Sequence, residues 1–192
     1  MVMPDTKVWT REDVLALPDD GNRYELVDGV LLVSPSPRAL HQVAVSEFYD
    51  RLKRYVRDHR LGTVLFSPAD LDLRSGQLVQ PDIFVLPTTS GQPFRDWADA
   101  GIPSLIVEVL SPSTARHDRV TKRRLYQRTR VATYWIVDLD ARLVEVWTDG
   151  AAAPVVVDQT LLWSPSASIP ALRIELAELF REIIGDEPTP LA

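Results

Sequence analysis

The sequence predicts a mixed α/β protein in which a central β-sheet is flanked by helices. Apolar runs of strand length alternate along the chain with segments whose apolar residues recur at helical spacing. Most of the 15 prolines fall between these runs, where they separate one element from the next. The 192 residues include no cysteine, so the core must hold the fold without disulfides, and we expect one domain over residues 1–192.

Composition and charge exclude several classes of protein. Hydrophobic residues make up 45% of the chain and charged residues 25%, which is ordinary for a globular domain. The formal net charge of -6 argues against a protein that coats nucleic acid through bulk positive charge. The first residues lack the apolar run of a signal peptide, and no stretch has the length of a transmembrane helix. We therefore expect a cytoplasmic protein without a membrane partner.

The first part of the chain predicts a helix, a hairpin and a second helix. Thr10 is a typical N-cap residue, and Glu12 and Asp13 fall in the first turn of the helix that follows it. The dipeptide Asp28-Gly29 stands between two apolar arms, which indicates a β-hairpin. Residues 41–62 carry apolar side chains at helical spacing and end on a glycine, so they predict the longest helix.

The remaining elements alternate between strands and helices. Strand-like runs cover residues 63–73, 76–87 and 104–111, and residues 133–148 read as a second hairpin. Between them, Ser113 or Thr114 could cap a basic helix that runs to about Thr129. The chain then predicts a short amphipathic helix before Gly185.

Glu108 is a charged residue inside a strand that is otherwise apolar. It shares a face with Ile106 and Leu110, and the residues of the opposite face, 105, 107 and 109, are apolar too. This pattern is typical of a strand covered on both sides, where a lone carboxylate is strongly penalised unless it is paired or bound to a metal. Glu108 is therefore either the partner of an arginine from the basic helix or a metal ligand or acid/base group at a sheet edge.

Asp82 has the same character as Glu108. It follows Pro81, which marks an edge, a bulge or the start of a strand, and it leads into the apolar run 83–86. Such an aspartate can simply turn the chain after the proline. If the two strand-borne carboxylates converge, they can instead hold a hard divalent cation such as Mg²⁺.

Lys122 supplies a cation near these carboxylates. Asp118, Lys122 and Tyr126 are spaced four residues apart, so they line one helix face. They could form only a surface ion pair worth about 0.2–0.5 kcal/mol. Beside the two carboxylates, Lys122 would instead orient an attacking water or stabilise developing charge on a phosphate.

Two basic segments stand out in this acidic chain. Residues 116–130 contain seven basic residues and one acid, and residues 51–60 contain five basic residues and one acid. Each segment could be an ordinary solvated helix face. Together they predict an anion-facing surface, in which Arg116, Arg119, Arg123 and Arg124 contact backbone phosphates.

Six blocks of the sequence resemble the Uma-two family of putative restriction endonucleases, which lies within the PD-(D/E)XK nuclease superfamily. In order, they are "YELVDG", "HQVAV", "QPDIFVLP", "LIVEVLSPST", "HDRVTKRRLY" and "VATYWIVD", and the match runs from about Tyr24 to Trp147. The resemblance implies a restriction-endonuclease-like core with an added N-terminal hairpin and a divalent metal at a sheet edge.

The resemblance also assigns residues. Asp82 becomes the aspartate of the Pro-Asp motif and Glu108 the second acidic residue, both as metal ligands and catalytic residues. The lysine usually found two residues after the second acid is absent, because Leu110 stands there, which points to Lys122 on the next helix. Glu25 and His41 match family blocks as auxiliary members of the metal or water network, while Arg130 and Thr133 replace the family's frequent Gly and Glu.

The function expected from these features is a DNA endonuclease dependent on Mg²⁺, with Mn²⁺ as an alternative metal. A homodimer would suit the cutting of two strands. Two rivals stay open. One is a nucleic-acid-binding protein on a nuclease fold that no longer cuts, because fold does not fix function. The other is an assembly domain whose carboxylates are structural ion-pair partners.

Overall fold

The structure is a computed structural model that describes residues 7–73, 76–88, 94, 96–97 and 100–185. Its centre is a six-stranded mixed sheet with the strand order β3-β4-β5-β6-β7-β8. The strands are β3 (Gly62–Phe66), β4 (Ile83–Pro87), β5 (Leu105–Val109), β6 (Thr133–Asp138), β7 (Leu143–Thr148) and β8 (Val155–Val157). The β5–β6 pairing is parallel and the other pairings in this sheet are antiparallel. The mixed α/β class predicted from the sequence is confirmed.

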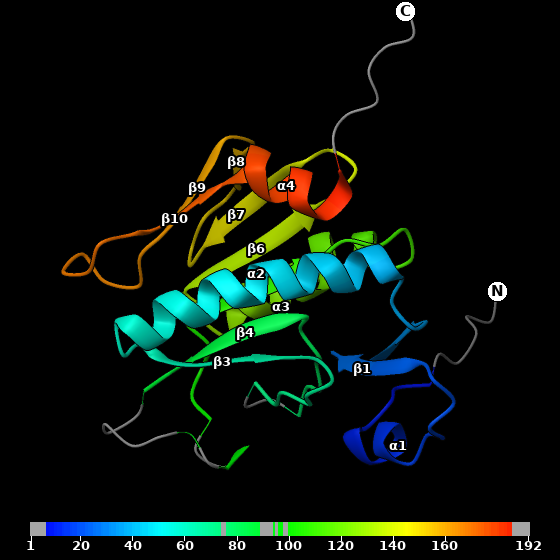
Figure 1. The fold of residues 1–192 in the computed structure, drawn as a ribbon. Coiled ribbons are helices and arrows are strands. Elements are labelled where there is room, and N and C mark those ends of the chain that lie inside the picture. The colour runs from blue at the N-terminus through cyan, green and yellow to red at the C-terminus, as the bar shows by residue number, and fades with distance from the viewer. Residues whose placement is uncertain (1–6, 74–75, 89–93, 95, 98–99, 186–192) are drawn as a thin grey trace, which may run out of the picture.

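Helices cover both faces of the sheet. On one face, α2 (Ala39–Asp58) and α4 (Leu176–Ile184) pack on the larger apolar core, and Figure 1 shows α2 lying across the sheet. On the other face, the π-helix η2 (His117–Lys122) continues directly into α3 (Arg123–Arg128), which lies behind α2 in Figure 1. All five residues of β5 are buried, as expected for a strand covered on both sides.

The N-terminal segment forms a small unit beside the sheet. The helix α1 (Arg11–Leu15) begins at Thr10 with a capping box, in which Thr10 and Asp13 exchange hydrogen bonds. The hairpin of β1 (Arg23–Val27) and β2 (Val30–Ser34) turns at Asp28 and Gly29, whose φ angles of 52° and 76° suit a tight two-residue turn. This unit packs on the rest of the chain through a small apolar cluster of Val14, Leu26 and Leu78, and Val27 and Leu32 of its hairpin join the second large core.

Several details differ from the sequence expectations. The run 63–73 is a strand only as far as Phe66, and the run 76–87 is a strand only from Ile83. The long helix ends at Asp58 rather than near Gly62, because the chain turns through Arg60 at φ 55° and Gly62 already begins β3. The C-terminal third also contains more strands than the sequence indicated. Besides β8, a two-stranded sheet of β9 (Thr160–Trp163) and β10 (Leu172–Glu175) precedes α4.

Within the described part of the chain, no helix is both long and apolar enough to cross a membrane.

Gly62 is required where β3 begins. Its φ is 145°, and a Cβ atom at this position would lie 1.9 Å from the carbonyl oxygen of Leu86 on the paired strand. We expect Gly62→Ala to lower the free energy of unfolding by at least about 2 kcal/mol, measured by urea denaturation. Gly101→Ala is the matched control, because a Cβ atom added at Gly101 would have no described atom within 4 Å. Equal stability of the two variants would contradict this account of β3.

Candidate functional site

Asp82 and Glu108 converge at one end of the sheet. The antiparallel register of β4 and β5 pairs Ile83 with Val107, and its continuation by one residue sets Asp82 opposite Glu108. The Val109 amide donates a hydrogen bond of 2.8 Å to Asp82 Oδ2, which fixes the aspartate against the end of β5. Both carboxylates are almost fully buried. The convergence that the sequence left as one of two alternatives is therefore present.

Lys122 lies at the centre of the site. Its Nζ is 2.9 Å from Glu25 Oε2, 3.0 Å from Glu108 Oε1 and 3.4 Å from Asp118 Oδ1, and its side chain is 1% exposed. The lysine missing after Glu108 in sequence is thus supplied in space by the next helix. The partner of Glu108 is this lysine rather than an arginine.

The π-helix η2 brings two of these groups together. Asp118 and Lys122 both lie within it, and Tyr126 follows on α3, where its hydroxyl donates a 3.0 Å hydrogen bond to Glu108 Oε1. The three residues therefore share the face that their spacing predicted. A wide π-turn inside a helix is uncommon and is frequent at functional sites.

Glu25 joins the site from the N-terminal hairpin. Its Oε2 faces Lys122, and its Oε1 accepts a 2.7 Å hydrogen bond from the backbone amide of Gln80. Glu25 therefore ties β1 to the segment that leads into Asp82. The assignment of Glu25 to the site, which rested on the resemblance, agrees with this position.

Arg23 and His41 hold the other side of Asp82. Arg23 donates to Asp82 Oδ1 at 2.9 Å, and His41 Nε2 lies 3.1 Å from Asp82 Oδ2. The sequence analysis placed His41 near the site but missed Arg23. Arg23 lies two residues before Glu25, so strand alternation puts it on the same face, and that spacing was the available signal.

The buried cluster carries an excess of negative charge. It contains the four carboxylates of Glu25, Asp82, Glu108 and Asp118 against Lys122 and Arg23, which leaves a formal charge of −2 with His41 counted as neutral. Burial raises the pKa of Glu108 well above its ordinary value; Lys122 opposes this shift, and the nearby carboxylates add to it. Burial likewise raises the pKa of Asp118.

The pKa shifts of Asp82 and Lys122 favour their charged forms. Burial alone would raise the pKa of Asp82, but the hydrogen bond from His41 and the charges of Arg23 and Lys122 hold it below its usual range. Burial would lower the pKa of Lys122, but the carboxylates around it raise it above the ordinary value. Glu108 is therefore the carboxylate of the cluster whose ionised form is most disfavoured.

The donor set of the cluster fits a hard divalent cation in chemistry and in charge. Among the residues that the structure describes, no group of three or more His, Cys, Asp or Glu has an arrangement that could hold a metal. Asp82 and Glu108 nevertheless bring carboxylate oxygens, the ligands that Mg²⁺ prefers, to the same end of the sheet. A dication would also match the formal charge of −2. Since Arg23 and His41 contact Asp82, its oxygens would have to be shared or released.

A pocket opens beside Asp82. We call it the arginine pocket, because Arg23 and Arg38 line it together with His41, residues 34–37 and residues 111–114. Its volume is about 210 Å³. Arg23 and His41 line the pocket and also contact Asp82, so the pocket ends at the buried cluster.

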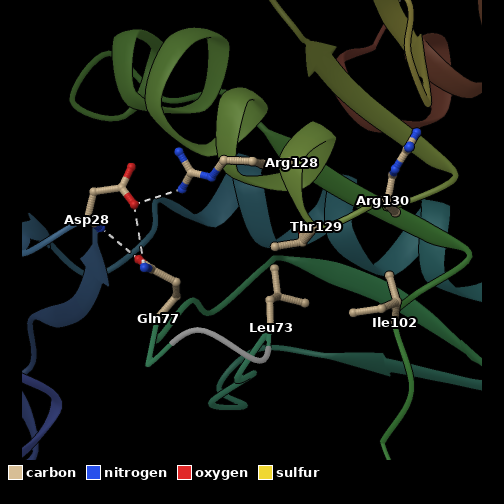
Figure 2. Close-up of a pocket in the computed structure, with 7 residues that line it drawn as sticks. All are labelled: Asp28, Leu73, Gln77, Ile102, Arg128, Thr129 and Arg130. Atoms are coloured by element: carbon tan, nitrogen blue, oxygen red, sulfur yellow. Dashed lines mark hydrogen bonds and ion pairs between the residues drawn. The ribbon is translucent and has the colours of Figure 1, made fainter.

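A larger pocket of about 590 Å³ lies elsewhere and contains no member of the cluster (Figure 2). Figure 2 shows Arg128 directed at Asp28, which it pairs with at 2.7 Å, and Gln77 beside the same aspartate. Leu73 and Ile102 line the pocket next to Thr129. The carboxylate of this pocket, Asp28, is exposed and paired with Arg128, so we place the candidate site at the buried Asp82 and Glu108.

The four arginines predicted to contact phosphates differ in their surroundings. Arg119 pairs with Asp138 at 2.8 Å and with Glu145 at 2.7 Å, and Arg123 stacks on the ring of Trp147. Arg116 and Arg124 are exposed, and no ion pair with a described residue engages either of them. The structure thus leaves Arg116 and Arg124 as the two arginines of this set that are open to an anion.

Comparison with known proteins relates the chain to a family of putative restriction endonucleases. A family model described as "Uma2: Putative restriction endonuclease" matches residues 11–177. The chain is also similar to a crystal structure of a putative nuclease belonging to DUF820 from Anabaena variabilis ATCC 29413. That likeness has a TM-score of 0.65 and 18% identity, and it covers 92% of this chain and 99% of the other. At this identity it shows the fold alone. No curated protein matches the chain.

Replacement of Glu108 by glutamine tests the electrostatics of the cluster. Because the folded-state pKa of Glu108 is raised, its ionised form reduces stability as pH rises above the unfolded value of about 4.3. Lys122 retains Glu25 and Asp118 in the variant. At pH 7.5 we therefore expect the melting temperature of metal-free Glu108→Gln to equal or exceed that of the wild type. The difference in melting temperature between the two proteins should be smaller at pH 5.

Glu145→Gln is the control for this measurement, because Glu145 pairs with Arg119 outside the cluster. It should show no stabilisation that grows with pH. A pH-independent loss of thermal stability in Glu108→Gln would instead favour a structural ion pair between Glu108 and Lys122.

Proposed function

Because the chain belongs to the Uma2 family of putative restriction endonucleases, we propose that it hydrolyses phosphodiester bonds in DNA with a divalent metal ion. The observation that carries this proposal is the convergence of Asp82, Glu108 and Lys122 in one buried cluster. Glu108 lies on β5, Lys122 on η2 and Asp82 directly before β4. Their combination of two carboxylates and a lysine suits phosphate hydrolysis.

Asp82 and Glu108 are the proposed ligands of Mg²⁺ or Mn²⁺. When bound, such an ion lowers the pKa of a coordinated water and stabilises negative charge on the phosphate. Asp82 is oriented for this role by the Val109 amide, and Glu108 by the Tyr126 hydroxyl. These second contacts fix the carboxylates before any ligand arrives.

Lys122 would act on the same phosphate as a fixed positive charge. Its raised pKa keeps it protonated, so it can orient a water or stabilise developing negative charge but cannot serve as a base. Glu25 and Asp118 position its ammonium group from two sides. Both are therefore positioning residues in this proposal, as is Tyr126.

DNA would be held through its backbone by the basic helix. Arg116 and Arg124 are exposed and would contact phosphates directly, whereas the charge of Arg119 is already compensated by Asp138 and Glu145. Phosphate contacts supply affinity without reading sequence.

A second candidate is a nucleic-acid-binding protein that does not cut. The burial of Lys122 and its engagement by three carboxylates favour this alternative, because a catalytic lysine must reach the reacting phosphate. Under this alternative the basic helix would bind nucleic acid and the cluster would only stabilise the fold.

Asp82→Asn separates the two candidates. The amide keeps the shape of the side chain but weakens metal binding, so we expect cleavage of a plasmid in Mg²⁺ or Mn²⁺ to fall by at least about 100-fold. Calorimetry should show the loss of metal binding in the same variant, while DNA affinity persists. The matched control is Asp138→Asn, since Asp138 ends β6 and pairs with Arg119 away from the cluster.

Absence of cleavage and of metal binding in the wild type, with DNA bound, would overturn the nuclease proposal in favour of the second candidate. If cleavage falls equally in Asp82→Asn and Asp138→Asn, the assignment of Asp82 as a metal ligand is wrong.

The salt dependence of DNA binding tests the basic helix. Each phosphate contact contributes about −0.9 to the slope of log affinity against log salt concentration, so the double variant Arg116→Ser, Arg124→Ser should lose about 2 from its magnitude. Arg54→Ser, Arg57→Ser on α2 is the control and should retain the wild-type slope. The helix α2 covers the face of the sheet opposite to α3, so the two basic segments do not form the single surface that the sequence predicted. If all three proteins show the same slope, the DNA does not contact the basic helix.

A further inference from the structure

We propose that the arginine pocket binds a single phosphate group of a nucleic-acid strand. This inference rests on the proposed function and adds the place where one backbone or terminal phosphate is held next to Asp82. The basic helix would hold the strand more broadly, whereas this pocket would fix one phosphate beside the cleavage site.

The chemistry of the pocket wall matches an anion. Two guanidinium groups and one imidazole line it, from Arg23, Arg38 and His41, and the described lining residues include no carboxylate. Five hydroxyl groups complete the polar lining, those of Ser34, Ser36, Ser111, Ser113 and Thr114. A phosphate oxygen accepts hydrogen bonds from all of these donor types.

The N-terminus of α2 lies at the same pocket. Arg38 is its N-cap residue and makes no side-chain capping hydrogen bond, and the first turn contains no acidic residue. The first backbone N–H groups of this 20-residue helix therefore have no side-chain acceptor from the cap. An anion in the pocket would accept from them and would also benefit from the helix dipole.

His41 gives a second, independent sign of a missing ligand. Its Nε2 contacts Asp82, but its Nδ1 is buried without a hydrogen-bond partner among the described residues. Buried polar atoms without a partner are rare in folded proteins. A phosphate group bound in the pocket would supply the partner that this nitrogen lacks.

Arg23 connects the pocket to the cluster. One of its terminal nitrogens binds Asp82 at 2.9 Å, and its side chain keeps 20% of its surface exposed. A guanidinium has five N–H donors, so Arg23 can bind a phosphate and still contact Asp82. A phosphate held there would lie next to one of the two proposed metal ligands.

The size of the pocket restricts what enters it. At about 210 Å³ it is smaller than the roughly 300–1,000 Å³ of sites that enclose whole small molecules. A phosphate with its attached sugar oxygens suits this space better than a nucleobase does. The pocket would therefore position the strand without reading its sequence.

Calorimetry in EDTA tests the proposal without metal. The probes are inorganic phosphate, a dinucleotide with a 5′-phosphate, a dinucleotide with only its internal phosphodiester, and a nucleoside without phosphate. We expect one or more phosphate-bearing probes to bind and the nucleoside not to bind. Arg38→Gln and Arg23→Gln should each weaken binding at least about tenfold.

Arg54→Gln on the outer part of α2 is the matched control and should bind like the wild type. Arg38 is exposed and outside the buried cluster, so its variant keeps the test meaningful if Arg23→Gln does not fold. Binding of only the 5′-phosphorylated dinucleotide would assign the pocket to strand ends, and binding of both dinucleotides would assign it to internal phosphates as well.

The proposal is overturned if no phosphate probe binds in EDTA, or if Arg38→Gln and Arg54→Gln bind alike. Cleavage is measured separately. If the protein cuts DNA but binds no phosphate without metal, only the pocket proposal is wrong. If it binds phosphate but never cuts DNA, only the nuclease proposal is wrong.

Discussion

The buried ammonium of Lys122 is the interaction on which the organisation of this site depends. A lysine with almost no exposed surface needs its charge compensated, and here carboxylates from three separate parts of the chain provide that compensation. Glu108 arrives with the central strand, Asp118 with the π-helix and Glu25 with the N-terminal hairpin. The lysine therefore sets how these three elements must lie against one another, and the same arrangement brings Asp82 and Glu108 together.

The sheet and the helices were predictable because their patterns are local. The apolar faces of β5, the spacing along α2 and the turn at Asp28 and Gly29 each follow from a few neighbouring residues. The short strands β8, β9 and β10 escaped prediction because three- or four-residue runs carry too little periodicity. Their placement depends on contacts with β7 and with each other rather than on their own sequence.

The site was predictable only in part. Two unexplained carboxylates and one helix face led to Asp82, Glu108 and Lys122, because a charge within an apolar strand is costly and visible in sequence. Arg23 was missed, since an arginine at a strand end looks like any solvated residue until its partner is known. For the same reason the sequence could not separate Arg119, which is held by Asp138 and Glu145, from the open Arg116 and Arg124.

The N-terminal hairpin brings equal and opposite charges to the buried cluster. Glu25 adds one carboxylate and Arg23 adds one guanidinium, so docking of the hairpin leaves the formal charge of −2 unchanged. The net charge of the cluster is therefore the same after docking, but two specific ion pairs form, between Glu25 and Lys122 and between Arg23 and Asp82. Apolar contacts hold the hairpin at two places: Leu26 packs with Val14 and Leu78 in a small cluster, and Val27 and Leu32 are buried in the second large core. The segment that supplies two members of the site is thus secured both by a minor apolar cluster and by the large core on the α3 face of the sheet.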